Sequence, residues 1–273
     1  MTRLFILIGS FCVAAFAAAA QTRAEAAFAD GEKLEYAVSY KVSLINTDVA
    51  GVTISTRTED FNGRRVFTVD GLGKTYPFYR WFFDLNDQYI SVLDSATLRP
   101  LELRTEIREG KYRYSSKFSY DWDSMVVNNA FRNHARNPDF NRKQLKITEG
   151  SYDGLALFFN LRCADLSELE KAGGESTMNL VLEDTIRVIR YRLLGRETKN
   201  VRGTGKFRTL KFRCELATST GESFADGSEF TIWITDDRNR IPVYIESPIR
   251  VGSIRARLID YKNLKYPLDS KIN

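Results

Sequence analysis

The sequence predicts a mainly β protein, with a curved antiparallel sheet that forms a barrel or half-barrel around one central apolar helix. Three observations lead to this fold class. Runs of alternating apolar and polar residues recur at a spacing of about ten residues, with turn-forming residues between them. The aromatic residues, 18 Phe, 13 Tyr and 3 Trp, favour strands. Only residues 151–163 show a clear helical spacing of apolar side chains.

The first strands are predicted to form an antiparallel meander. Alternating runs occupy residues 32–45, 49–60 and 66–69, and Asn62-Gly63 lies between the second and the third. An Asn-Gly pair in this position is the strongest short signal for a β-hairpin. Residues 74–83 hold too many aromatic side chains for clean alternation, so we expect a short helix or a packed loop wedged against the sheet. Further strands are predicted at residues 88–93, 98–108, 112–120 and 125–130.

The polar segment 128–142 contains the only histidine, His134, and we expect an exposed loop there. A catalytic or metal-binding histidine needs partner groups. Its neighbours Asn133, Arg136 and Asn137 do not form a ligand set. We therefore interpret His134 as a solvated loop residue.

Residues 151–163 are predicted to form the central helix. Ser151 and Asp153 can each offer a side-chain oxygen to the free N–H groups of a first helical turn. Side chains then recur at intervals of three and four on two stripes, formed by Leu155, Phe158, Phe159 and Arg162 and by Leu157 and Leu161. Because the helix is apolar over most of its circumference, we expect the sheet to cover it on nearly every side.

The second half of the chain returns to strands after a turn at Gly173-Gly174. We expect a charged connection at residues 196–205 and strands at residues 178–182, 186–194, 207–216, 229–235, 241–245 and 253–261. No linker or internal repeat interrupts this series. The sequence therefore predicts a single domain at residues 27–273.

The N-terminus has the features of a cleaved signal peptide. Arg3 precedes a mostly apolar run from Leu4 to Ala20, and small residues follow in the pattern that a signal peptidase cuts. We expect residues 1–20 to be removed, with a cut as late as residue 26. A membrane anchor is the alternative, since the run is close to the shortest length that spans a bilayer. The mature chain is then expected to be periplasmic or secreted, with no transmembrane segment.

Two cysteines remain after this cut, Cys163 and Cys214, and in an oxidising compartment they are a candidate disulfide. The alternative is two buried free thiols. Cys214 lies on an apolar stripe with Leu210, Phe212 and Leu216, which suits a buried thiol.

The chain has a formal net charge of +5, and part of its positive charge is concentrated in one region. The basic residues of that region are Arg187, Arg190, Arg192, Arg196, Lys199, Arg202, Lys206, Arg208, Lys211 and Arg213. Nucleic-acid binding needs aromatic side chains interleaved on the same exposed face, and these are absent from the pattern. We interpret the region as a solvated outer face, and attraction to anionic envelope material is the alternative.

Motifs for catalysis are missing from the sequence. It has no nucleophile elbow, no phosphate-binding glycine loop and no His-Glu-x-x-His, and one histidine is too few for most zinc sites. Asp236-Asp237 resemble paired carboxylates for acid–base chemistry or calcium, but their position between strands fits a polar hairpin turn. We expect no enzyme, no metal and no cofactor. A hydrolase built on scattered Asp and Glu is the remaining enzymatic alternative.

A curved sheet with one helix across it can leave an apolar groove for an acyl chain. The candidate lining is Phe158, Phe159, Trp233, Tyr244 and Leu258, with Arg240 and Arg250 at the entrance to meet an anionic head group. The alternative is a sealed core, in which helix and sheet pack directly against each other.

Four segments together resemble a bacterial envelope family catalogued as domain of unknown function 3108. They are SYDGLALFFNLR (151–162), FTIWITDD (230–237), RIPVYIE (240–246) and VGSIRARL (251–258). The resemblance implies a secreted β-rich protein of Gram-negative bacteria with no assigned activity, and it carries over no catalytic residues.

The function expected from all this is a non-enzymatic envelope protein that binds a lipid or other hydrophobic ligand. The alternatives are a structural or interaction module for an envelope protein partner and a hydrolase that acts on envelope material.

Overall fold

The computed structural model describes residues 25–42, 45–134, 139–171, 173–217, 229–248 and 252–272. The expected signal peptide and Arg250 lie outside the described residues.

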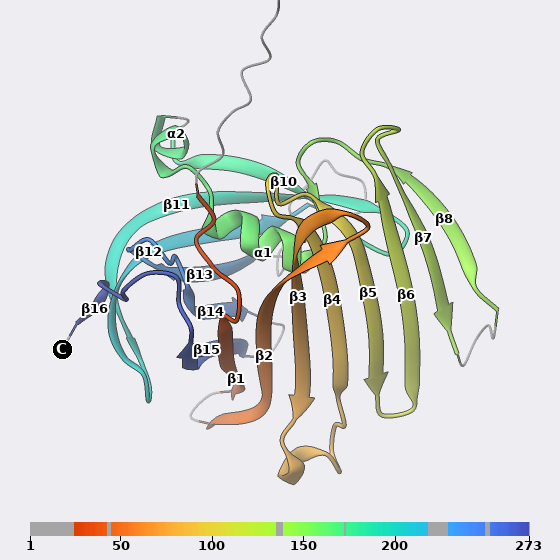
Figure 1. The fold of residues 1–273 in the computed structure, drawn as a ribbon. Coiled ribbons are helices and arrows are strands. Elements are labelled where there is room, and N and C mark those ends of the chain that lie inside the picture. The colour runs from red at the N-terminus through yellow and green to blue at the C-terminus, as the bar shows by residue number, and fades with distance from the viewer. Residues whose placement is uncertain are drawn as a thin grey trace, which may run out of the picture.

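The described residues form one large curved sheet with two arms (Figure 1). The first arm consists of β1 (Lys33–Val42), β2 (Ile45–Phe61), β3 (Arg64–Thr75), β4 (Asn86–Asp94), β5 (Pro100–Glu109), β6 (Tyr112–Asp121), β7 (Val126–Asn133) and β8 (Asn141–Lys146). The second arm consists of β10 (Glu175–Val181), β11 (Ile186–Val201), β12 (Gly205–Leu216), β13 (Glu229–Thr235), β14 (Pro242–Pro248) and β15 (Ser253–Lys262). Two short strands complete the sheet, β9 (Ser151–Tyr152) beside β10 and β16 (Lys271–Ile272) beside β12.

Each arm is an antiparallel meander, and β1 pairs with β15 to join the two arms. The strand order ends at β8 on one side and at β9 on the other, so the sheet is a half-barrel that does not close. This confirms the predicted fold class. The hairpin at Asn62-Gly63 is confirmed as well, because both residues have the positive φ angles, 54° and 78°, that a tight hairpin turn requires.

The central helix is α1 (Gly154–Arg162), which lies between the two arms, inside the curve (Figure 1). Asp153 caps it and accepts hydrogen bonds from the N–H groups of Leu155 and Ala156 at 3.0 and 2.9 Å. Ser151 has a different role from the expected one, because it belongs to β9 and its hydroxyl accepts a hydrogen bond from Thr148 N–H.

The sheet covers α1 from both arms. Ala156 and Phe159 are fully buried in an apolar cluster that includes Val69 and Leu93 of the first arm. On the other side, Leu161 belongs to a cluster with residues of β11, β12 and β13. Burial of one such large apolar side chain stabilises the fold by about 1.5–3 kcal/mol. Helix and sheet therefore form one core, as predicted for an apolar helix.

Two segments expected to be irregular are strands. The predicted loop at residues 128–142 contains the end of β7 and the start of β8, because the polar side chains there belong to the edge of the sheet. The predicted charged connection at residues 196–205 is mostly β11, which continues to Val201 and pairs with β12. A second short helix, α2 (Leu166–Lys171), follows α1 and was not predicted.

The loop between β3 and β4, residues 76–84, is called the aromatic loop below. We expected it to be wedged against the sheet, and this was wrong. Pro77–Tyr79 form one 3-10 turn, η1, and the side chains that follow point into solvent. Thr75 N–H donates to the Leu85 carbonyl at 3.0 Å and closes the loop at its base, so the residues between them project beyond the strands.

Candidate functional site

An open cleft of about 540 Å³ lies at the C-terminal end of α1. We call it the Arg240 cleft. Its lining residues come from four separate parts of the chain: Glu25, Ala27, Arg162, Cys163, Ala164, Asp165, Leu166, Asp236, Asp237, Arg238, Arg240 and Tyr266. A volume of this size suits a small organic ligand or part of a lipid.

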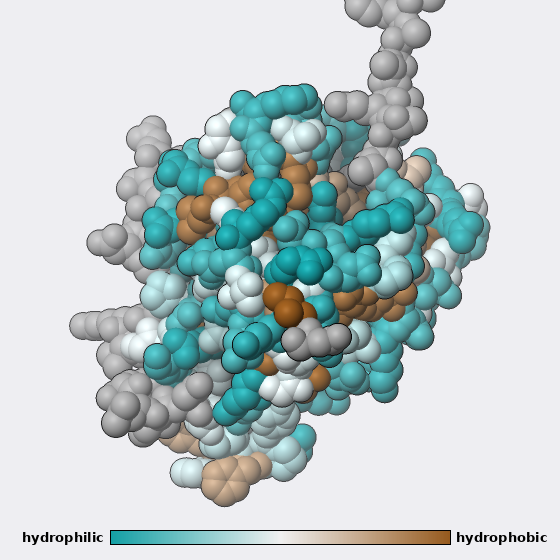
Figure 2. Space-filling model, turned by 90° about the vertical axis from the view of Figure 1, so that its left-hand side faces the viewer, coloured by the Kyte–Doolittle hydropathy of each residue, from teal (hydrophilic) through white to brown (hydrophobic). Residues whose placement is uncertain are grey.

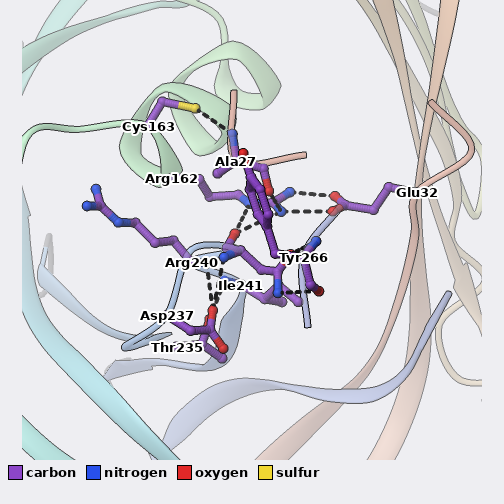
Figure 3. A network of polar contacts seen from close by, with 10 residues as sticks. Ala27, Glu32, Arg162, Cys163, Thr235, Asp237, Arg240, Ile241 and Tyr266 are labelled. Atoms are coloured by element: carbon purple, nitrogen blue, oxygen red, sulfur yellow. Dashed lines mark hydrogen bonds and ion pairs between the residues drawn. The ribbon is translucent and has the colours of Figure 1, made fainter. Parts of the chain in front are cut away.

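The floor of the cleft is built on a buried ion pair between Arg162 and Glu32 (Figure 3). Both side chains are almost completely buried, and the guanidinium binds the carboxylate through two hydrogen bonds of 2.6 and 2.9 Å. Arg162 also donates to the carbonyl oxygens of Asn239 and Ala27. One guanidinium therefore connects the end of α1, the N-terminal segment and the turn between β13 and β14.

The turn between β13 and β14 is held by the carboxylate of Asp237. This carboxylate accepts hydrogen bonds from the Thr235 hydroxyl at 2.9 Å, from Asn239 N–H at 3.0 Å and from the Ser270 hydroxyl at 2.6 Å. Arg240 follows with φ of 46°, a left-handed conformation that turns the chain into β14. Asp237 thus acts as a structural acceptor that positions Arg240.

Arg240 is a half-buried cation without a paired carboxylate among the described residues. Its guanidinium donates a hydrogen bond to the carbonyl oxygen of Ala164. Burial lowers the pKa of Arg240. The negative charges of Asp165 and Asp236 act in the opposite direction from a distance and raise this pKa. Both of those carboxylates have other partners: Asp165 caps α2 through Ser167 N–H, and Asp236 pairs with Arg196 at 3.3 Å. The guanidinium of Arg240 can therefore bind an anionic group of a ligand.

The surroundings of Arg240 combine polar and apolar surface. Ala27, Ala164 and Leu166 supply apolar contacts in the Arg240 cleft. A second pocket of about 440 Å³ shares Cys163, Ala164 and Asp165 with the cleft. Its other lining residues include Tyr152, Leu169, Met178 and Tyr191. Two adjoining pockets of this character suit an amphipathic ligand better than a fully polar one.

The residues predicted to line an apolar groove lie in the core or pack against it. Phe158, Phe159, Trp233, Tyr244 and Leu258 all belong to one apolar cluster, in which Phe159 and Leu258 are fully buried. None of the five lines either of the two pockets beside α1. Of the predicted entrance residues, Arg240 lines an open cleft, and Arg250 lies outside the described residues.

The sheet face on which Trp233 lies follows from the strand register. The strand register places Trp233 on the same face as Lys211 and Tyr244. Ile232 points to the opposite face and shares a cluster with Leu161 of α1. Trp233 and Tyr244 instead pack with Lys199, whose ammonium lies 3.5 and 4.2 Å from the centres of the two rings. The register therefore places these two aromatic residues on the sheet face opposite to that of Ile232.

The candidate disulfide is not formed, because Cys163 and Cys214 are both free thiols. They belong to different apolar clusters: Cys163 packs next to the one that contains Phe159, and Cys214 lies within the one that contains Leu161. Burial raises the pKa of Cys214 to about 12. This thiol is therefore protonated at neutral pH, as a core residue is expected to be.

The other sequence candidates are in structural positions. His134 is exposed at the end of β7, where its ring contacts the Ser115 hydroxyl at 3.2 Å. Many of the basic residues at 187–213 face solvent or form ion pairs across strands, such as Arg192 with Glu175. In the described part of the chain, no three His, Cys, Asp or Glu side chains are close enough together to hold a metal ion. No helix in that part is both long enough and apolar enough to cross a membrane.

Several cleft residues were not predicted, namely Glu25, Ala27, Asp165, Arg238 and Tyr266. They carry no shared motif and are far apart in the sequence. The sequence did contain one signal: Arg162 lies on a stripe with Phe158 and Phe159, and a charge on an apolar stripe needs a buried partner.

The comparisons with known proteins agree with the fold. The family model described as Protein of unknown function (DUF3108) matches residues 35–259. No curated protein matches the chain. A crystal structure of a beta-barrel-like protein of domain of unknown function DUF1849 from Brucella abortus is similar, with a TM-score of 0.54 and 11% identity. The match covers 85% of this chain and 97% of that chain, and it shows a shared fold.

A second solved structure, the lipoprotein LppX from Mycobacterium tuberculosis, has a TM-score of 0.26 and 12% identity. This match covers 85% of this chain and 89% of that chain.

Proposed function

Since the chain belongs to the family described as Protein of unknown function (DUF3108), whose description names no activity, we propose from its own geometry that it is a non-enzymatic binding protein of the cell envelope. Its ligand is amphipathic: an anionic group binds Arg240, and the apolar part lies along the Arg240 cleft and the adjoining pocket. The location in the cell envelope is inferred from the apolar run at residues 4–20 and from the small residues that follow the pattern of a signal-peptidase cleavage site.

The observation that carries this proposal is the state of Arg240. Removing a guanidinium from water is costly unless an anion or several acceptors replace the lost water. Arg240 is half-buried and donates to one carbonyl, and its nearby carboxylates are engaged elsewhere. A phosphate or carboxylate of a ligand fits the remaining donors of the planar guanidinium.

The absence of catalysis is part of the proposal, and it is supported by what the acidic residues do. Asp237 holds the turn that positions Arg240, and Asp236 forms an ion pair with Arg196. A general base needs a carboxylate that can take a proton from a substrate. These two carboxylates have structural partners instead.

The test is a calorimetric titration of the mature protein with dodecyl phosphate. We expect Arg240→Met to weaken binding by about tenfold or more, because it removes the charge and keeps most of the length. Arg240→Lys keeps the charge and is expected to recover part of the affinity.

Arg238→Met is the matched control, because Arg238 lines the same cleft but already pairs with Glu25 and packs on the ring of Tyr266. Dodecyltrimethylammonium, which has the opposite charge, is expected to bind weakly. Equal affinity of the wild type and Arg240→Met for dodecyl phosphate would refute the proposal. Mass spectrometry of organic extracts from natively purified protein then identifies the natural ligand.

A further inference from the structure

We infer that the aromatic loop, residues 76–84, is a membrane-docking element that inserts its side chains into the interface of a lipid bilayer. This inference is independent of ligand binding at the Arg240 cleft. It concerns the surface by which the protein meets its surroundings.

The aromatic loop exposes a concentration of apolar surface. Phe78, Trp81 and Phe82 are 74%, 80% and 80% exposed, and Phe83 beside them is 49% exposed. In Figure 1 the loop forms the lowest point of the molecule, and in Figure 2 apolar and pale side chains form the lowest tip. Single exposed apolar residues are common, but four adjacent aromatic ones indicate an interaction site.

The exposure is not explained by a loosely held loop, because the backbone is well anchored. Tyr76 N–H donates to the Val49 carbonyl at 2.9 Å, and the Tyr79 hydroxyl bonds the Thr47 hydroxyl at 2.6 Å. Phe82 and Phe83 both donate their N–H groups to the Tyr79 carbonyl. The loop is thus ordered in a conformation that turns two tyrosines inward and leaves the other rings in water.

The shape of the loop favours a bilayer over a protein partner. The loop projects from the sheet as a convex tip in Figure 1, and the rings of Trp81 and Phe82 make an edge contact with 5.9 Å between their centroids. A convex tip can enter a fluid interface without a matching pocket. Trp is also enriched at the boundary between lipid head groups and acyl chains, where its ring is apolar and its N–H meets water.

The charges around the loop fit an anionic bilayer surface. Lys74 and Arg80 are exposed at its base, where Arg80 also lies 4.0 Å from the carboxylate of Asp84. The turn between β5 and β6 lies beside the loop, since Gly110 N–H donates to the Asp84 carbonyl at 2.7 Å. Exposed Lys111 and Arg113 follow that turn. Basic side chains next to inserted aromatic rings add electrostatic attraction to anionic lipids.

The position of the loop leaves the Arg240 cleft free during docking. The cleft is next to α2, since it includes Asp165 and Leu166. In Figure 1, α2 lies at the top of the molecule and the aromatic loop at the bottom. Docking through the loop therefore directs the cleft away from the membrane.

The test is flotation of the mature protein with vesicles made of equal parts phosphatidylglycerol and phosphatidylethanolamine. We expect the wild type to float with these vesicles, and Trp81→Ser/Phe82→Ser to lower the partition coefficient by about tenfold or more. Higher salt, or vesicles of phosphatidylcholine alone, should weaken binding of the wild type. Because both rings are mostly exposed, the double variant is expected to keep the wild-type denaturant midpoint, and Phe82→Ser alone is the milder second variant.

Phe140→Ser is the matched control, because Phe140 is another exposed aromatic residue, at 51%, outside the loop. It should float like the wild type, and so should Arg240→Met, which separates this inference from the proposed function. The inference fails if the wild type does not float, or if the double variant floats equally well. It also fails if vesicles bind neither the wild type nor the double variant, while the wild type crosslinks to one envelope protein and the double variant does not.

Discussion

At the scale of single residues, the Arg162–Glu32 ion pair is expected to have a large effect on the free energy of unfolding. Both groups are buried, so removal of one leaves an unpaired charge without water. We expect Arg162→Met to lower the free energy of unfolding by about 3–5 kcal/mol, and Glu32→Gln to have a similar effect. The double variant should lose less than the sum, because it leaves no lone charge. Urea titrations of the four proteins in a double-mutant cycle measure this coupling, and strictly additive losses would contradict it.

At the scale of elements, the start of α1 depends on a completely buried carboxylate. Burial raises the pKa of Asp153 to about 6, against the hydrogen bonds from Ala156, Ser91 and Leu155 that lower it. The folded state therefore keeps a proton that the unfolded chain releases near its ordinary pKa of 3.8. The contribution of Asp153 to stability thus falls as pH rises from about 4 to about 6. We expect Asp153→Asn, which does not titrate, to gain about 2–3 kcal/mol relative to the wild type between about pH 4 and pH 7. Denaturant titrations at both pH values check this, and a constant difference between the two proteins would rule it out.

At the scale of the whole molecule, the open half-barrel predicts uneven protection of its backbone. Among the described strands, β8 pairs with β7 alone, whereas β3 pairs with β2 and β4 and contributes Val69 to the core beside α1. We expect the amides of β8 to exchange with solvent deuterium much faster than those of β3, since an edge strand opens without disturbing the core. Hydrogen exchange followed by mass spectrometry compares the two strands directly. Equal protection would show that another contact closes this edge.

The sequence by itself determined the features that depend on local pattern. Alternation predicted most strands, Asn62-Gly63 predicted the first hairpin, and the spacing of Leu155, Phe158 and Phe159 predicted α1 and its burial. These features follow from backbone geometry within a few residues. β8 escaped prediction for the same reason, because an edge strand needs no continuous apolar face and its residues alternate poorly.

Only the tertiary structure decided where functional surface lies. The Arg240 cleft joins residues near positions 25, 164, 237 and 266, and the carboxylate that pairs with Arg162 is 130 residues away. Composition predicts burial for Phe78, Trp81 and Phe82, yet the hydrogen-bonded base of the aromatic loop holds them beyond the ends of the strands. Conversely, Phe159 and Leu258 suit a ligand groove by chemistry but fill the core. An apolar side chain has the same hydrophobicity in each setting, and what differs is whether the fold brings another surface to cover it.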